Sequence, residues 1–238
     1  MSIRPERLVV SSHGAMVRGV LCVPRGSGAY PLVLVLHGSD GFGPQHVHAA
    51  RRLARSGFAA VAMEWFGGTP ERARWGDLRP GDLAGVVNEA ASRPRVDRTR
   101  LAVMGFSRGG GVALLAATVL PATRAVVNYF GLTSWKGGLE TYRHFDLDPA
   151  DPLGFVARIP CPVLSLHGER DDIVPVVNTW ALDEACRRHG IEHRVVIYPG
   201  VGHSFVWRGN PLHVPAAHQH SWNAVLDFLR ECLRVRAR

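Results

Sequence analysis

The chain has 238 residues, 46% of them hydrophobic and 20% charged, and carries a formal net charge of +8. This length and composition predict one domain, residues 1–238, with a sizeable core, and no run approaches the ~20 apolar residues that a membrane span needs. Because the basic residues are scattered rather than grouped in a block, we expect a solvated basic surface, with neither nucleic acid nor membrane as a partner.

The four cysteines are far apart in the sequence and form no C-x-x-C pair: Cys22, Cys161, Cys186 and Cys232. In a chain of this size, that spacing favours buried free thiols over a disulfide framework. The first residues, MSIRPERLVVSSHG, contain no apolar core of a secretory signal. These features together predict a cytoplasmic protein.

Apolar strand-like segments alternate with amphipathic helical segments along the chain. The predicted strands cover residues 8–12, 16–24, 31–38, 58–64, 100–105, 124–131, 162–168 and 193–200. The predicted helices cover residues 46–57, 81–92, 107–120, 176–189 and about 217–235. Continuously apolar strands that alternate with helices predict an α/β fold with a mainly parallel sheet covered by helices on both faces. The connection 131–160 is either a small mobile cap or an ordered link.

A glycine-rich stretch, GFSRGGG at residues 105–111, joins a predicted strand to a predicted helix. Glycine is costly in regular structure because it loses the most backbone freedom on folding, so this density needs a geometric reason. A G-x-S-x-G pattern between strand and helix is typical of a sharp turn that exposes a serine hydroxyl above the sheet, in front of a helix N-terminus. The pattern therefore predicts Ser107 as a nucleophile.

A serine hydroxyl needs a base, and His203 follows the last predicted strand in the segment YPGVGHSF. Asp171 follows the preceding strand in LHGERDDIVP, where a carboxylate would orient the imidazole and stabilise its cation. Asp172 is the alternative to Asp171. The chain order Ser, Asp, His is the order of the α/β-hydrolase fold, and the sequence predicts a triad of Ser107, His203 and Asp171.

Ester chemistry also needs donors for the oxyanion. The backbone N–H of Arg108, directly after the nucleophile, is one candidate. The backbone N–H of Ser39, in the loop after the first apolar strand, is the other.

The remaining histidines have simpler interpretations. His37 and His167 each precede a glycine at a strand end, where packing of the turn is the expected role. His213, His218 and His220 lie close in sequence, but no cysteine or carboxylate pattern accompanies them. We therefore expect neither a metal nor an organic cofactor.

Several motifs, in this order, resemble the dienelactone hydrolase family of α/β-hydrolases. They are LVLVLHGSDGFG, GFAAVAMEWFGG, VDRTRLAVMGFSRGG, LHGERDDIVP and YPGVGHSF. The resemblance spans nearly the whole chain. It implies the α/β-hydrolase fold with a short cap and no large lid domain, the Ser107–His203–Asp171 triad, and Ser39 and Arg108 as oxyanion donors. The namesake enzymes use a cysteine nucleophile, so the serine at position 107 favours a serine esterase.

The same resemblance implies a substrate pocket built from the loops that follow the strands. Phe42, Trp65 and Trp207 are candidate wall residues. Arg208 follows GHSF about where the namesake enzymes place an arginine for an acidic lactone, although the spacing here is one residue longer. It is the candidate for binding a substrate carboxylate.

The sequence thus predicts a serine hydrolase that cleaves carboxylic esters or lactones through an acyl-enzyme. The motif set also looks like the hydrolase domain of acyl-CoA thioesterases and bile-acid acyltransferases, so thioester cleavage and acyl transfer remain alternatives. A non-catalytic binding module on the same fold is the third alternative. The expected partner is a small-molecule ester, lactone or thioester, and no oligomeric state is indicated.

Overall fold

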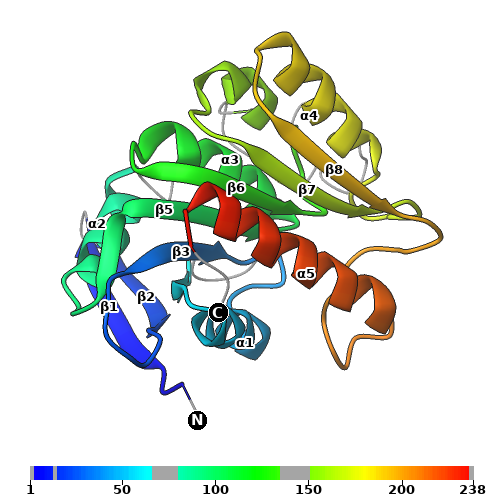
Figure 1. Ribbon diagram of the computed structural model, residues 1–238. Coiled ribbons are helices and arrows are strands. Elements are labelled where there is room, and N and C mark those ends of the chain that lie inside the picture. Colours follow the sequence, from blue (N-terminus) through cyan, green and yellow to red (C-terminus); the bar gives the residue numbers. More distant parts are fainter. Residues whose placement is uncertain (1–2, 13–14, 66–79, 135–150, 236–238) are drawn as a thin grey trace.

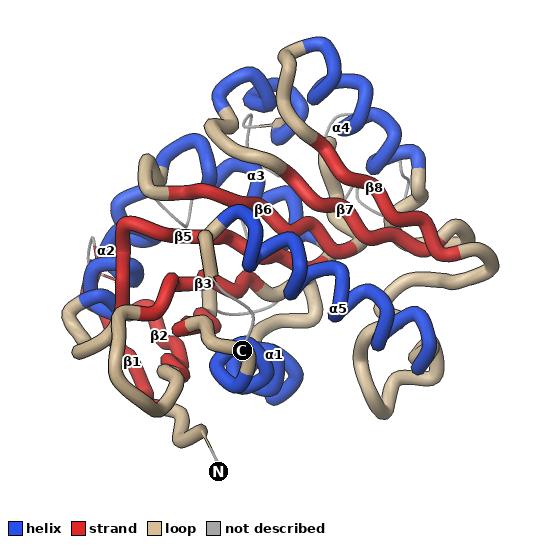
Figure 2. The backbone as a smooth tube through the Cα atoms, in the orientation of Figure 1, coloured by secondary structure: helices blue, strands red, loops and turns tan. Residues whose placement is uncertain are grey.

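An eight-stranded sheet forms the centre of the computed structural model, which describes residues 3–12, 15–65, 80–134 and 151–235. The strand order is β1-β2-β4-β3-β5-β6-β7-β8 (Figures 1 and 2). The strands are β1 (Glu6–Ser12), β2 (Ala15–Cys22), β3 (Tyr30–Leu36), β4 (Ala59–Met63), β5 (Val96–Phe106), β6 (Thr123–Tyr129), β7 (Val163–Gly168) and β8 (His193–Tyr198). Strands β1, β2 and β4 pair antiparallel, and the pairs from β4 to β8 are parallel.

Helices cover both faces of this sheet (Figure 1). They are α1 (Pro44–Arg55), α2 (Pro80–Ala91), α3 (Arg108–Val119), α4 (Val177–Arg188) and α5 (Pro215–Cys232), with a 3₁₀ helix η4 (Pro152–Arg158). Helices α1 and α5 pack on one face, and α2, α3, α4 and η4 pack on the other. The fold class and the flanking helices therefore agree with the sequence-based expectation.

Burial on both faces explains why the central strands are apolar throughout. All seven residues of β3 are buried, and its side chains alternate between two hydrophobic clusters. Leu32, Leu34 and Leu36 face the α2–α3 side, and Val33 and Val35 face the α1–α5 side. A strand covered on both sides has no solvent face for polar residues, which is the pattern of parallel sheets.

The element boundaries differ from the predicted ones by a few residues, most at the start of β5. This strand begins at Val96 rather than at residue 100, because Val96 and Asp97 pair with Tyr30 and Pro31 of β3. Most residues of this segment are polar, so a hydropathy pattern does not predict that pairing.

The predicted cap, 131–160, falls largely on residues 135–150, which lie outside the described ranges. Within those ranges, no helix combines the length and apolarity needed to cross a bilayer.

The topology brings four loops to the carboxyl edge of the sheet. They follow β3, β5, β7 and β8 and contain Ser39, Ser107, Asp171 and His203 respectively. Because parallel strands end at the same edge, residues distant in sequence meet there.

Candidate active site

The turn between β5 and α3 holds Ser107 in a rare backbone conformation. Its φ of 52° and ψ of −122° lie outside the regions that L-residues normally occupy. The backbone N–H of Ser107 donates to Tyr129 O at 2.9 Å, and the Ser107 carbonyl accepts from the N–H groups of Gly110 (2.9 Å) and Leu132 (3.1 Å). These three hydrogen bonds hold the strained turn in place, as is typical of functional sites.

Glycines on either side of the serine make this turn sterically possible. A Cβ on Gly105 would collide with the carbonyl oxygen of Gly109. A Cβ on Gly109 would collide with the carbonyl oxygen of His37 at the end of β3. The turn therefore packs backbone against backbone, and this close approach is the geometric reason for the glycine-rich motif.

The imidazole of His203 lies between the Ser107 hydroxyl and the Asp171 carboxylate. Its Nε2 is 3.1 Å from Ser107 Oγ, and its Nδ1 is 2.6 Å from Asp171 Oδ2. A carboxylate only accepts, so Nδ1–H donates to Asp171 and Nε2 accepts the serine O–H. His203 and Asp171 are buried, and Asp172 is exposed. The structure thus brings together the three predicted residues, with Asp171 rather than Asp172 against the imidazole.

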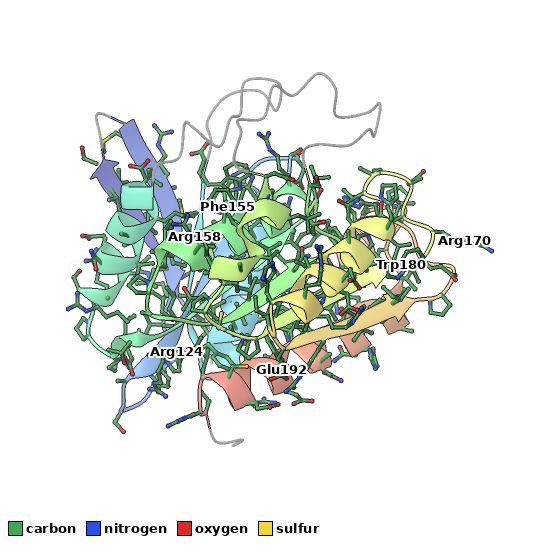
Figure 3. All side chains as sticks on the ribbon, turned by 90° about the horizontal axis from the view of Figure 1, so that it is seen from above. Arg124, Phe155, Arg158, Arg170, Trp180 and Glu192 are labelled. Atoms are coloured by element: carbon green, nitrogen blue, oxygen red, sulfur yellow. The ribbon has the colours of Figure 1, made fainter. Side chains whose placement is uncertain are left out.

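Both oxygens of the Asp171 carboxylate are fully hydrogen-bonded. Oδ1 accepts the backbone N–H groups of Ile173 at 3.0 Å and Val174 at 2.8 Å. Burial alone would raise the pKa of Asp171, but the hydrogen bonds from His167, His203 and Val174 outweigh it and lower the pKa to about 2. The side chain is therefore an ionised carboxylate at neutral pH. In the same loop, Arg170 projects outward at the molecular edge (Figure 3).

His167 is the site residue whose role the sequence interpretation missed. It is fully buried, and its Nε2 lies 2.7 Å from Val174 O and 3.2 Å from Asp171 Oδ2. Because both of these oxygens accept, Nε2 carries the proton and Nδ1 accepts the Thr179 hydroxyl at 2.7 Å. His167 therefore supplies a second N–H to the oxygen that His203 contacts. The four-residue spacing from His167 to Asp171 is the only sequence signal of this contact.

The loop after β3 lies directly against the serine turn. A Cβ on Gly38 would be 3.1 Å from Ser107 Cβ and 3.2 Å from Phe106 O. Ser39 follows in this loop, and its hydroxyl is buried without a hydrogen-bond partner among the described residues. Arg108 begins helix α3, so its backbone N–H belongs to the helix N-terminus. The two predicted oxyanion donors therefore come from neighbouring backbone segments.

His37 and Trp65 support this loop from below. The indole Nε1–H of Trp65 donates to His37 O at 2.7 Å, and its backbone N–H donates to His37 Nε2 at 3.3 Å. His37 Nδ1–H consequently donates to Gly38 O at 2.7 Å. Burial, with a contribution from the charge of Arg108, lowers the pKa of His37 to about 4 and keeps the ring neutral. Trp65, a predicted pocket wall, is buried and stacked on His37, where it supports this loop.

The other predicted pocket residues lie on the α1 side of the site. Phe42 stacks on His46 at a centroid distance of 6.1 Å, and Trp207 contacts Phe106 at 4.5 Å. Arg208 is exposed and lines a cavity between α1 and α5. Ser107, His203 and Asp171 do not line that cavity.

No metal is expected at the C-terminal histidines because no cysteine or carboxylate pattern accompanies them. His213 Nε2 is 3.0 Å from His218 Nδ1, so one ring donates to the other. Within the described ranges, no group of three or more histidine, cysteine or acidic side chains could hold a metal ion.

Comparison with known sequences defines the family. The model of the dienelactone hydrolase family matches residues 17–233, which is most of the chain. The chain belongs to the dienelactone hydrolase family. A Bradyrhizobium protein named "Probable 2-oxo-3-(5-oxofuran-2-ylidene)propanoate lactonase" is 29% identical, over 93% of this chain and 92% of that protein. A Methylorubrum extorquens protein named "Putative carboxymethylenebutenolidase" is 28% identical, over 88% of this chain and 75% of that protein.

Solved structures show the same fold in this family and in peptidases. A crystal structure titled as a dienelactone hydrolase-like promiscuous phosphotriesterase from metagenomic libraries superposes with a TM-score of 0.77 at 21% identity, covering 98% of this chain and 99% of that one. Acylaminoacyl peptidase from Pyrococcus horikoshii superposes with a TM-score of 0.83 at 17% identity, covering all of this chain and 43% of that one. This dienelactone hydrolase family member is a hydrolase of the α/β-hydrolase fold.

Proposed function

We propose that this dienelactone hydrolase family member is a serine hydrolase that cleaves carboxylic esters or lactones through an acyl-enzyme on Ser107. One observation carries the proposal: the buried imidazole of His203 lies within hydrogen-bond distance of both Ser107 Oγ and the Asp171 carboxylate. This is the arrangement that turns a weak alcohol into a nucleophile.

In the first half of the reaction, Ser107 Oγ attacks the acyl carbon while its proton moves to His203 Nε2. The negative charge that develops on the carbonyl oxygen is stabilised by the backbone N–H groups of Ser39 and Arg108. Collapse of the tetrahedral intermediate breaks the bond between the acyl carbon and the leaving oxygen. His203 Nε2–H then protonates the leaving alkoxide, which leaves the acyl group on Ser107.

In the second half, a water molecule takes the place of the alcohol. His203 Nε2 accepts its proton as the oxygen attacks the acyl-enzyme, and the returning Ser107 oxygen then takes that proton. Asp171 stays ionised throughout and stabilises the imidazolium. With its donors at 2.6–3.2 Å, the carboxylate cannot rotate without losing hydrogen bonds, so the imidazole keeps its orientation.

The substrate class rests on the family and on the nucleophile. The two relatives described above carry lactone-cleaving names, and an enol lactone and an activated ester present the same electrophilic carbonyl. A serine nucleophile with an imidazole base suits oxygen esters of this kind. We also propose a cytoplasmic location, which the four unpaired cysteines favour.

A fluorophosphonate probe tests the nucleophile directly. It should label one serine, and peptide mass spectrometry should locate the label at Ser107. Labelling should disappear in Ser107→Ala and fall strongly in His203→Ala. Labelling of another serine, or none in the wild-type protein, contradicts the proposal.

A substrate panel then defines the reaction. We would compare kcat/KM for matched oxygen esters, lactones and thioesters, and analyse products in the presence of amines and alcohols. The proposal expects the highest kcat/KM with an oxygen ester or lactone, and the free acid as product. A preference for thioesters, or an amide or new ester as the main product, would instead assign a thioesterase or an acyltransferase.

A further inference from the structure

A cavity between α1 and α5 is not lined by Ser107, His203 or Asp171, although it includes the predicted substrate-binding residues Trp207 and Arg208. Its volume is about 440 Å³, and it opens on the sheet face that these two helices cover. Its floor is aromatic and apolar, with Met104 and Phe106 of β5 and Tyr129 of β6. Trp207 and Trp222 add to the apolar lining. Such a surface suits the body of a small organic molecule.

The charged side chains of the lining are all cationic. Arg51 and Arg52 come from α1, and Arg208 comes from the loop before α5. No aspartate or glutamate lines the cavity, and none of these three arginines forms an ion pair within the described part of the chain. Three guanidinium groups thus line one cavity, and no carboxylate of the described residues balances their charge.

Arg52 is held in a fixed position at the wall. Its Nη1 donates to His218 Nε2 at 2.7 Å, and its guanidinium carbon lies 4.2 Å from the centre of the Trp222 ring. Because His218 Nε2 accepts, its Nδ1–H donates to His213 Nε2. The hydrogen bond and the stacking reduce the entropy that a ligand would otherwise lose in ordering this arginine.

The neighbouring histidines experience the same positive potential. Burial first, and then the charges of Arg52 and other basic neighbours, lower the pKa of His218 to about 4. Burial and the arginines of this region also lower the pKa of His48. The positive potential of the cavity therefore disfavours protonation of these histidines. An anion bound there would reduce the repulsion among the positive charges.

We propose that this cavity is a binding site for a small organic anion, a carboxylate or phosphate carried on an aromatic or short apolar body. The arginines would contact the anionic oxygens in the paired geometry that guanidinium groups favour. The body would lie on Phe106 and Trp222. Occupancy does not require Ser107, so the site is distinct from the hydrolytic centre.

Isothermal titration calorimetry with benzoate, phenyl phosphate and the neutral isostere benzamide tests the site. Both anions should bind with a Kd on the order of 1 mM or below, and benzamide should bind at least tenfold more weakly. Arg208→Gln and Arg51→Gln should each weaken anion binding by about tenfold, the effect of losing one charge-assisted contact. Arg55→Gln is the matched control, because it removes the same charge from α1 at a residue outside the lining.

Four results would overturn the inference. The first is equal affinity for benzoate and benzamide, and the second is unchanged affinity for both anions in Arg208→Gln and Arg51→Gln. The third is loss of anion binding in Ser107→Ala, or competitive inhibition of ester hydrolysis with an inhibition constant equal to the Kd. That third result would place the anion at the hydrolytic centre. Absence of any anion binding at millimolar concentration also contradicts the proposal.

Discussion

Two neighbouring regions that both include the end of strand β5 differ in whether their polar and charged side chains have partners. At the end of the strand, the side chains of His203, Asp171 and His167 all have hydrogen-bond partners. Slightly earlier in the same strand, Met104 and Phe106 line a cavity whose arginines have no carboxylate partner within the described ranges.

This difference indicates the function that each region suits. A fully partnered network holds atoms in one geometry and suits bond making and breaking, which requires orientation. A cavity lined by unbalanced charges has an unfavourable electrostatic energy when no ligand is bound. A ligand of opposite charge therefore lowers that energy on binding. Substitutions that change one region and leave the other intact are therefore the most informative experiments.

The largest expected effect is on hydrolysis in Ser107→Ala. Removal of the nucleophile should lower kcat/KM on a chromogenic short-chain ester by roughly four to six orders of magnitude. Benzoate affinity, measured by calorimetry, should stay at the wild-type value because Ser107 does not line the cavity. Near wild-type hydrolysis in this variant would disprove the assignment of the nucleophile.

The next largest effect is expected for Gly105→Ala. The new Cβ would meet the carbonyl of Gly109, so the serine turn must shift. We expect kcat/KM to fall at least about a hundredfold, and the free energy of unfolding, measured in urea, to fall by about 1–3 kcal/mol.

Gly85→Ala is the control for this glycine substitution. It adds the same methyl group in α2, where the new Cβ would meet only Val10 Cγ1, at 3.4 Å. It should keep full activity and stabilise the helix by up to about 1 kcal/mol. Similar behaviour of the two variants would mean that the turn is not tightly constrained.

A smaller effect on hydrolysis is expected for His167→Leu. Loss of its N–H removes one of the hydrogen bonds that lower the pKa of Asp171, so that pKa rises. The acid limb of kcat/KM should move to higher pH because Asp171 must be ionised for catalysis, and kcat/KM should fall by about 10–100-fold.

Thr179→Val serves as the comparison for His167. It removes only the hydroxyl that His167 Nδ1 accepts, and it leaves the N–H to Asp171 in place. We expect the acid limb of kcat/KM to shift clearly less in Thr179→Val than in His167→Leu. An unmoved limb in His167→Leu, with lower stability only, would show a purely structural role.

The last prediction concerns stability in acid rather than activity, and it involves both regions. Burial lowers the pKa of His46 to about 3, of His37 to about 4 and of His218 to about 4. Between pH 6.5 and 4 the unfolded chain binds protons that the folded chain does not, so stability falls as the pH falls. Each ring contributes about 1.4 kcal/mol per pH unit in this window and nothing above it.

Urea unfolding at a series of pH values measures this slope. His46→Phe should reduce this slope by the contribution of one histidine, about 1.4 kcal/mol per pH unit, because phenylalanine does not titrate. A slope identical to that of the wild type would mean that His46 is protonated in the folded protein.

The sequence determined the elements and the loops that carry the site. The continuous apolarity of β3 and the alternation of strands with helices are local patterns, so the layered sheet could be predicted from them. The positions of Ser107, Asp171 and His203 directly after strands placed them at one edge, because parallel strands share a carboxyl edge. The glycines around Ser107 likewise encoded the turn.

Only the tertiary structure decided which of two adjacent aspartates meets the imidazole and which additional histidine joins them. It also placed the Trp65 indole against the carbonyl of His37 and brought Arg52 of α1 into contact with His218 of α5. These outcomes depend on side-chain direction and on contacts between segments far apart in the chain. Neighbouring residues in a loop point in different directions, and a local pattern contains no information about which segment will pack opposite.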